Sequence, residues 1–292
     1  MNPLRWGDKP YHSLDYELKH QYGEKIYKIA LDAGMTCPNR DGTLGTGGCI
    51  FCSAGGSGDF ASPAASACGE YSIRQQLLEG LSYFHTKKTG NRFIAYFQSY
   101  TNTYAPTGRL RSLYTEALEE PDVVGISIAT RPDCLGDDVI ALLSSLKDSY
   151  PDKFIWVELG LQTMHEETAR FIRRGYPLST FEEALNRLHT ISVPVIVHVI
   201  LGLPHESKEM MIKTCNYLNS CHIDGIKLQL LHVLKNTDLA ALYEQKTFDI
   251  LSLEEYIDIV ITCLEVLSPG IVIHRVTGDG PKELLLAPAW GL

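Results

Sequence analysis

The chain has 292 residues, 45% hydrophobic and 21% charged, as in an ordinary soluble globular protein that forms one large α/β barrel or two modest domains. No apolar stretch approaches the roughly 20 residues that span a bilayer, and residues 1–28 lack the apolar core of a signal peptide. We therefore expect a cytoplasmic protein without a membrane partner, whose eight cysteines are reduced and suit metal ligation rather than disulfides. The net charge of −9 gives no global attraction for nucleic acid, so such a partner requires a local basic patch.

Short apolar runs rich in β-branched residues alternate with longer helical patterns, which indicates parallel strands joined by crossover helices. One α/β barrel, closed or partial, fits the spacing better than a doubly wound sheet. We expect residues 1–292 to form a single domain, with a core at about 24–270 and short extensions at both ends. Ser179 or Thr180 is predicted to cap the fourth helix. The predicted strands are 26–31, 92–98, 123–129, 154–159, 195–201 and 225–230, and the predicted helices are 71–85, 108–119, 137–149, 180–191, 208–220 and 253–267.

Three cysteines, Cys37, Cys49 and Cys52, lie in one loop directly after the first predicted strand. The Cys49-x-x-Cys52 pair places two sulfurs in one tight turn. Glycines let the loop fold back toward Cys37, because glycine adopts positive φ without steric cost. Three thiolates are one fewer than a structural zinc site takes, whereas a cubane iron–sulfur cluster on three cysteines leaves one iron open. The loop therefore favours a catalytic cluster. Its glycines are Gly42, Gly45, Gly47 and Gly48.

Other interpretations of the three cysteines stay open on the residues alone. Zinc requires a fourth ligand, which Cys68 or a histidine would supply. A thioredoxin-like redox pair is expected at the start of a helix in a much smaller domain, and plain packing is the third alternative. Cys215 and Cys263 fit packing on helix faces, and the sequence does not decide the roles of Cys68 and Cys134.

Polar residues follow all six predicted strands, and in parallel barrels the chemistry collects at the carboxyl ends of the strands. Taken singly, most such residues are solvated loop ends, but here one strand end also carries the cysteine loop. His198 lies within an apolar strand, where it is either a hydrogen-bonded core histidine or a cofactor contact. The other residues at or beyond the strand ends are Gln98, Ser99, Thr130, Glu158, Gln162, Gly202, Leu203, Gln229, His232 and Lys235.

Motifs spread over essentially the whole chain resemble the radical S-adenosylmethionine (SAM) superfamily. The branch that the chain resembles is the Elongator-catalytic-subunit-like and coproporphyrinogen-dehydrogenase-like one, closest to the YhcC-like group. The cysteine spacing, eleven residues and then two, is the long-loop variant of that group. The resemblance implies a partial (β/α)6-type TIM barrel. Its motifs are Gly55-Gly-Ser-Gly-Asp59, Thr130-Arg-Pro-Asp133, Gly160-Leu-Gln-Thr163, Arg173-Arg-Gly175, Gly202-Leu-Pro204, Leu231-His-Val-Leu-Lys-Asn-Thr237 and Ala287-Pro-Ala-Trp290.

The resemblance also implies two cofactors. Cys37, Cys49 and Cys52 are expected to bind three irons of a [4Fe–4S] cluster, whose open iron chelates the amino and carboxylate groups of SAM. Gln162 and Arg174 are expected to contact the SAM ribose and carboxylate.

Further SAM contacts follow from the same resemblance. Gln98 and Ser99 are expected beside the methionine amino group, and the backbone of Gly202 and Leu203 around the adenine. Thr130, Glu158 and His198 complete the expected set. The chain departs from the family pattern at Ala129, where relatives often have an acidic residue, and at His198, where some have aspartate. Glu158 is the residue expected to compensate for one of them.

The implied reaction starts with one-electron reduction of the cluster by a flavodoxin or ferredoxin. It continues with cleavage of a SAM sulfur–carbon bond and hydrogen abstraction by the 5′-deoxyadenosyl radical. No catalytic acid or base is predicted. The expected substrate side, with ordinary structural polarity as the alternative, consists of Lys227, Gln229, His232, Lys235 and Arg275.

For the substrate, the likeness to the Elongator catalytic subunit implies the C5 substituent of a transfer RNA wobble uridine, such as a carboxymethylaminomethyl group. One alternative is a small metabolite such as a porphyrinogen, which the acidic net charge favours mildly. The other is a non-catalytic iron–sulfur or zinc protein without SAM affinity. The residues that favour RNA are Arg170, Arg173 and Arg174, then Lys87, Lys88 and Arg92, and Tyr96, Tyr100 and Tyr104 for base stacking.

Overall fold

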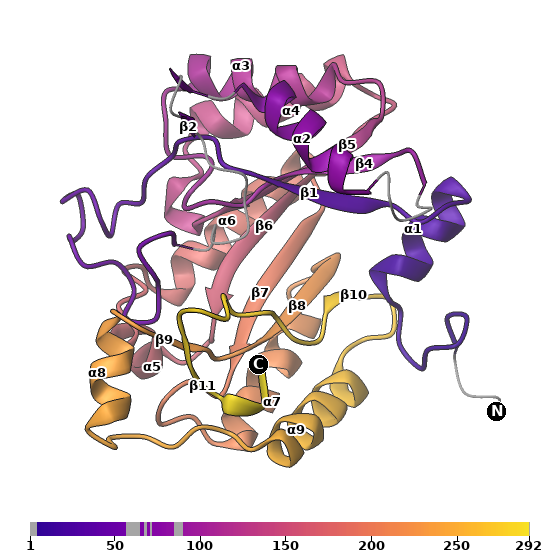
Figure 1. The fold of residues 1–292 in the computed structure, drawn as a ribbon. Coiled ribbons are helices and arrows are strands. Elements are labelled where there is room, and N and C mark those ends of the chain that lie inside the picture. The colour runs from indigo at the N-terminus through magenta and orange to yellow at the C-terminus, as the bar shows by residue number, and fades with distance from the viewer. Residues whose placement is uncertain (1–4, 57–64, 67–68, 71, 85–89, 292) are drawn as a thin grey trace.

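Seven parallel strands form the main sheet of the computed structural model, which describes residues 5–56, 65–66, 69–70, 72–84 and 90–291. The strand order is β1-β4-β5-β6-β7-β8-β10, and the sheet curls into an incomplete barrel (Figure 1). Within the described residues no ladder joins the edge strands β1 and β10. The strands are β1 Tyr27–Leu31, β4 Phe93–Phe97, β5 Val123–Thr130, β6 Phe154–Gln162, β7 Val195–Leu201, β8 Gly225–Leu230 and β10 Val272–Arg275. The predicted α/β partial barrel is confirmed, and β10 is a strand that the sequence analysis missed.

Six helices lie at the predicted places, and three more were not predicted. The predicted helices are α2 Ile73–Phe84, α3 Thr107–Leu118, α4 Asp137–Ser149, α6 Leu178–Thr190, α7 Lys208–Asn219 and α9 Leu253–Val266. The unpredicted helices are α1 Leu14–Tyr22, α5 Glu166–Phe171 and α8 Asp238–Glu244. The predicted end residues of α2, at positions 71 and 85, lie outside the described residues. No helix of the described chain is long and apolar enough to cross a membrane.

The predicted cap of α6 is wrong. The helix begins at Leu178, so Ser179 and Thr180 lie inside its first turn, and the residue at the cap position is Pro177. The carboxylate of Glu166 in α5 accepts a hydrogen bond of 2.6 Å from the Leu178 amide. A side chain from a neighbouring helix therefore supplies the acceptor that a local cap normally provides.

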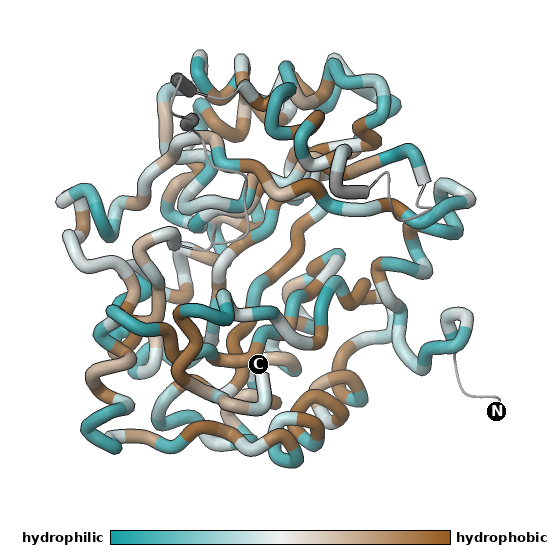
Figure 2. Tube along the Cα trace, in the orientation of Figure 1, coloured by the Kyte–Doolittle hydropathy of each residue, from teal (hydrophilic) through white to brown (hydrophobic). Residues whose placement is uncertain are grey.

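Apolar side chains of the strands pack against the surrounding helices in one large core. Figure 2 shows hydrophobic residues concentrated along the central strands, and hydrophilic residues more frequent on the helices. Cys215 and Cys263 are buried where α7 packs against α9, as predicted. Cys134 is partly buried in the short 3-10 helix Pro132–Cys134, and Cys68 lies outside the described residues.

The C-terminal segment returns to the barrel. Its strand β11, Leu285–Ala287, pairs antiparallel with β9, Val233–Leu234, which directly follows β8. On the N-terminal side, the Ile273 amide of β10 donates a hydrogen bond of 2.7 Å to the His12 carbonyl. Segments from both ends of the described chain therefore border the last strands of the sheet. The remaining short elements are β2 Ala65–Ser66, β3 Gly69–Glu70 and the 3-10 helix Ala289–Gly291.

A capping box begins α9 and gives a test of the helix start. The Ser252 hydroxyl accepts a hydrogen bond from the Glu255 amide (3.2 Å), and the Glu255 carboxylate accepts one from the Ser252 amide (2.8 Å). Ser252→Ala should lower the free energy of unfolding by about 1 kcal/mol, because an amide at the helix start loses its partner. Chemical denaturation measures the change. The exposed Glu254→Ala serves as the control and should change stability by less than about 0.5 kcal/mol; equal losses would contradict the role of the cap.

Candidate active site

A buried carboxylate lies at the centre of the barrel. Glu158 of β6 is 1% exposed and accepts four hydrogen bonds from side chains of four other strands. Oε1 accepts from Lys28 Nζ of β1 (2.7 Å) and from Ser127 Oγ of β5 (2.6 Å). Oε2 accepts from Lys227 Nζ of β8 (2.5 Å) and from His198 Nε2 of β7 (2.7 Å). The parallel register makes His198 and Lys227 neighbours, so both point at the same carboxylate.

The charges of this cluster depend on one another. Burial acts to raise the pKa of Glu158, but the charges of Lys227 and Lys28 outweigh it and hold that pKa well below its usual value. Burial lowers the pKa of Lys227 to about 7, although Glu158 opposes the shift. Burial and the charge of Lys227 lower the pKa of His198 to about 4. The Gln229 amide donates to His198 Nδ1 (3.2 Å), so a neutral ring carries its proton on Nε2 and donates it to Glu158.

The three cysteines predicted to bind the cluster border one cavity of about 190 Å³. Asn39 holds their loop against the chain after α5, because its amide donates to the Arg173 carbonyl (2.8 Å). Arg40 donates to the carbonyls of Cys52 (3.2 Å) and Ser53 (2.5 Å). Gly48 has φ +73°, and a Cβ there would lie 2.9 Å from Arg40 Nε, so the loop requires glycine at this position. The same cavity is lined by Thr130, Arg131, Glu158, Gly160, Gln162, Arg174, Tyr176, His198 and Gln229.

The surroundings of the thiols fit a cluster. A hydrogen bond from Cys52 lowers the pKa of Cys49 to about 7 against the effect of burial, and Arg131 and Asn39 add to the shift. The same hydrogen bond, with burial, raises the pKa of Cys52. Thiolate is the form that binds iron. Among the described residues, no group of three or more His, Cys, Asp or Glu side chains is arranged to hold a single metal ion. A four-iron cluster takes each thiolate on a separate iron, so thiols around a shared cavity are the arrangement it needs.

Arg174 fits the predicted contact with the SAM carboxylate, and it also holds the backbone. Its side chain is almost fully buried and donates to the carbonyls of Tyr176 (3.0 Å), Leu161 (3.1 Å) and Thr163 (2.6 Å). Its Nη2 has no hydrogen-bond partner among the described residues and lies 3.6 Å from the Glu166 carboxylate. Buried donors normally have partners, so this group suits an anionic ligand in the cavity. The contact with SAM stays a prediction.

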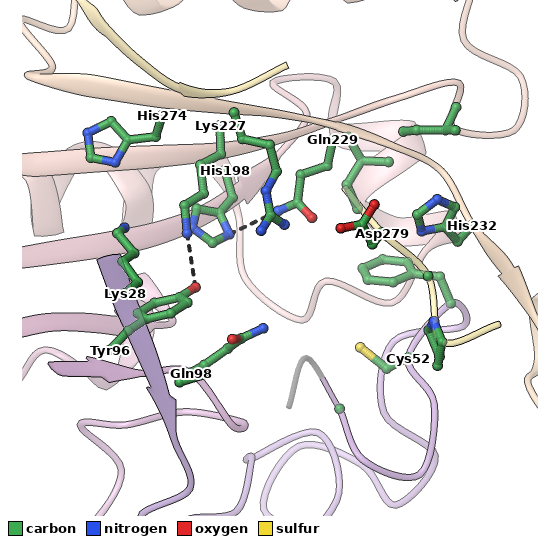
Figure 3. A pocket seen from close by; sticks show the side chains of 18 of the residues that line it. Lys28, Cys52, Tyr96, Gln98, His198, Lys227, Gln229, His232, His274 and Asp279 are labelled. Carbon is green, nitrogen blue, oxygen red and sulfur yellow. Dashed lines mark hydrogen bonds between the residues drawn. The ribbon is translucent and has the colours of Figure 1, made fainter. Parts of the chain in front are cut away.

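A larger cavity of about 610 Å³ adjoins the first, because both are lined by Cys52, His198 and Gln229. In Figure 3, Lys28, Tyr96 and Lys227 lie together on one side of this cavity, and Cys52, His232 and Asp279 on the other. Lys227 donates to the Tyr96 hydroxyl (3.0 Å). The predicted residues that line it are Gln98, His198, Lys227, Gln229, His232 and Arg275.

Four predicted residues line neither cavity. Ser99 is buried. The Gly202 amide contacts the Met211 sulfur (3.0 Å), and Leu203 packs in a small apolar cluster. The ammonium of Lys235 donates to the Glu283 carbonyl (2.8 Å).

Several residues expected on an RNA-binding surface are buried or are paired with other side chains. Arg174 is buried, and Arg173 forms an ion pair with Asp238. Tyr96 lies inside the barrel, with the ammonium groups of Lys227 and Lys28 at 4.3 and 4.9 Å from its ring centre. The guanidinium of Arg92 binds Glu24, and the hydroxyl of Tyr104 bonds that of Thr43. Lys87 and Lys88 lie outside the described residues.

Sequence reasoning gave no role to Lys28, Asn39 and Arg131. Lys28 is a charged residue in an otherwise apolar strand, which is a local sign that its side chain points away from the packed face. Asn39 lies between the first two cysteines. Arg131 belongs to the Thr130-Arg-Pro-Asp133 motif and binds Asp133 with both Nε (2.9 Å) and Nη2 (2.7 Å). A motif position alone did not reveal that contact.

Removal of the central carboxylate tests the buried cluster. Glu158→Ala should lower the free energy of unfolding by about 3–5 kcal/mol, because the buried ammonium of Lys227 and the partly buried one of Lys28 lose their counter-charge. The double variant Glu158→Ala, Lys227→Met should recover part of this loss, since it also removes one uncompensated charge. Chemical denaturation of the three proteins measures both effects. A single variant as stable as the parent protein would show that Glu158 does not hold the lysines.

The cysteine loop gives a second test. Cys49→Ala should abolish the brown colour of protein reconstituted with iron and sulfide, and also SAM cleavage, because two thiolates do not hold the cluster firmly. Absorption spectra and the yield of 5′-deoxyadenosine measure the two effects. Cys215→Ala, which changes only a packed thiol, should keep the cluster at a cost of at most a few kcal/mol in stability. Full turnover by the Cys49 variant would remove Cys49 from the ligand set.

The chain is similar to several proteins of known sequence. The chain is 44% identical to the uncharacterized protein YtqA of Bacillus subtilis, over all of this chain and 88% of that protein. It is 35% identical to YhcC of Escherichia coli, over 94% of this chain and 85% of that protein. Elongator complex protein 3 of Schizosaccharomyces pombe is 25% identical over 88% of this chain, which spans 53% of that protein.

Solved structures share the fold. The Elp3 protein of the archaeon Methanocaldococcus infernus superposes with a TM-score of 0.67 at 15% identity, over 89% of this chain and 58% of that one. HemN of Escherichia coli, a coproporphyrinogen III oxidase, superposes with a TM-score of 0.53 at 17% identity, over 85% of this chain and 54% of that one. Residues 223–292 match the model of the Radical_SAM C-terminal domain, and residues 41–218 match that of the radical SAM superfamily. The chain therefore belongs to the radical SAM superfamily, in the branch predicted from its motifs, and its cofactors are a [4Fe–4S] cluster and SAM.

Proposed function

We propose that this radical SAM enzyme modifies the C5 substituent of a wobble uridine in transfer RNA, for example a carboxymethylaminomethyl group. The observation that carries the proposal is the likeness to Elongator complex protein 3, which extends over 88% of this chain. The likeness includes the barrel, as the TM-score of 0.67 to the archaeal Elp3 indicates. Membership of the superfamily sets aside the alternative of a non-catalytic metal protein.

The larger cavity is suited to a base that is flipped out of the RNA. Its wall contains both apolar side chains and polar groups that are able to form hydrogen bonds with the edge of a base, among them Gln98, Gln229 and His232. A mixed lining of this kind is typical of sites for small organic groups. When bound, the cluster and SAM supply the radical that abstracts a hydrogen atom from the substrate. The residues of this chain orient the substituent beside that chemistry and exclude water.

Two further partners belong to the proposal. A flavodoxin or ferredoxin supplies the electron. An acidic protein binds transfer RNA through few phosphate contacts, so the affinity of the enzyme for transfer RNA should fall only modestly as the salt concentration rises. Arg275 is exposed at the cavity wall and is one cation available for such a contact.

Nucleoside analysis tests the substrate. Transfer RNA that carries the precursor wobble nucleoside should lose it when incubated with reconstituted enzyme, SAM and a reductant, and 5′-deoxyadenosine should form in proportion. Mass spectrometry of the digested RNA measures the conversion. Cys49→Ala should convert none, whereas exchange of the exposed Lys213 of α7 for Met should leave the conversion unchanged.

Different results separate the alternatives. Formation of 5′-deoxyadenosine with no change in any nucleoside, and no RNA binding at low salt, would remove RNA as the substrate. A small metabolite would then be the substrate class to pursue. Cells that lack the enzyme should accumulate the precursor nucleoside, and unchanged profiles would contradict the proposal in the same way.

A further inference from the structure

The larger cavity is richer in positive charge than the chain around it. The whole chain has a net charge of −9, yet three described residues that line the cavity are cationic and one is a carboxylate. The carboxylate, Asp279, is exposed. Two of the cations, Lys28 and Lys227, lie at the inner end, where Glu158 is the counter-charge. Two ammonium groups against one carboxylate leave this end with excess positive charge.

The two lysines donate only some of their available hydrogen bonds to Glu158. An ammonium has three donors. Lys227 donates one hydrogen bond to Glu158 and one to the Tyr96 hydroxyl, and Lys28 donates one to Glu158. Among the described residues, donors therefore remain on both groups. The third cation, Arg275, pairs through its backbone with β8, and its guanidinium has no hydrogen bond or ion pair with a described residue.

The two ammonium groups share the same surroundings. They lie 4.3 Å (Lys227) and 4.9 Å (Lys28) from the centre of the Tyr96 ring, and each binds a different oxygen of Glu158. A carboxylate has two oxygens that accept hydrogen bonds side by side, so one carboxylate is able to bind both groups.

We infer that the inner end of the larger cavity binds a carboxylate of the substrate through the ammonium groups of Lys28 and Lys227. The identity of the molecule rests on the proposed function, in which the carboxylate is that of the carboxymethylamino group on the uridine. A carboxylate held there directs the neighbouring methylene toward the side of the cavity where Figure 3 shows Cys52.

The pKa of Lys227 supports the assignment. Burial lowers it to about 7 despite the nearby Glu158, so the ammonium is poorly compensated in the absence of a ligand. A bound carboxylate favours the charged form of lysine and raises this pKa. Affinity for a carboxylate should therefore be highest below about pH 7 and fall as the pH rises above it. The titratable and charged groups around Lys227 are Lys28 of β1, Tyr96 of β4, Glu158 of β6, His198 of β7, and His274 and Arg275 of β10.

The first experiment compares two ligands with reconstituted enzyme by titration calorimetry. At pH 6.5, 5-carboxymethylaminomethyluridine should bind about ten- to a hundredfold more tightly than its uncharged carboxamide, because the acid gains charge-assisted hydrogen bonds. The preference should shrink as the pH rises through about 7 to 9. Lys227→Met and Lys28→Met should each reduce it, and the matched surface variant Lys213→Met should not. Lys28→Met also covers the case in which the Lys227 variant does not fold, since Lys28 is partly exposed.

The second experiment does not depend on uridine. An amine-reactive acetylating ester labels Lys227 of the reconstituted enzyme, and mass spectrometry follows the rate. Acetate should slow the labelling of Lys227 severalfold, acetamide at equal concentration should not, and Lys213 reports any general effect. Inorganic phosphate at equal ionic strength is the third probe.

The outcomes distinguish the two proposals. Equal affinity for acid and carboxamide would overturn the carboxylate site and leave the uridine proposal standing. Binding of neither nucleoside, with protection of Lys227 by acetate, would remove uridine and keep the carboxylate site. No protection by acetate and no preference for the acid would overturn the inference, and so would stronger protection by phosphate than by acetate.

Discussion

The structure depends on the compensation of one buried charge. An isolated carboxylate in the interior would cost far more free energy than the fold gains elsewhere, so Glu158 requires donors from all sides. Those donors come from β1, β5, β7 and β8. In the order of the sheet, β1 and β8 are separated by four strands, yet Lys28 and Lys227 meet at the same carboxylate. A flat sheet would hold them far apart, and the curl of the barrel is therefore coupled to this contact.

The polar cluster also explains why the barrel contains a cavity. Closed barrels of parallel strands fill their interior with layers of branched apolar side chains. Here lysine, histidine, tyrosine and glutamate side chains point inward. Hydrogen bonds, rather than close packing, fix the directions of these side chains. The space that they leave adjoins the cysteine loop through Cys52, His198 and Gln229. A polar interior that is held in place by a buried charge thus leaves a cavity beside the three cysteines.

Local sequence patterns predicted most strands and helices. The features that they missed depend on contacts between residues far apart in the sequence. Apolar runs and helical periodicity placed six strands and six helices, but β10 has only four residues and becomes a strand by pairing with β8. The start of α6 depends on Glu166, which belongs to another helix. The cysteines and Gln162 were predicted from their motifs, and all four line the smaller cavity. The partnership of Lys28 with Glu158 spans 130 positions, and no local pattern encodes it.

The two halves of the site differ in how the fold constrains them. The cysteine loop follows β1 and Gln162 ends β6, and none of their side chains is among the hydrogen-bond partners of Glu158 that the structure describes. Lys227 lies within β8, beside His198 in the register, and it serves both the buried carboxylate and the cavity. A substitution that altered the charge of the cavity wall at this position would also alter the compensation of Glu158. The charge of the cavity wall is therefore tied to the stability of the barrel, whereas the side chains of the cysteine loop take no part in the cluster around Glu158.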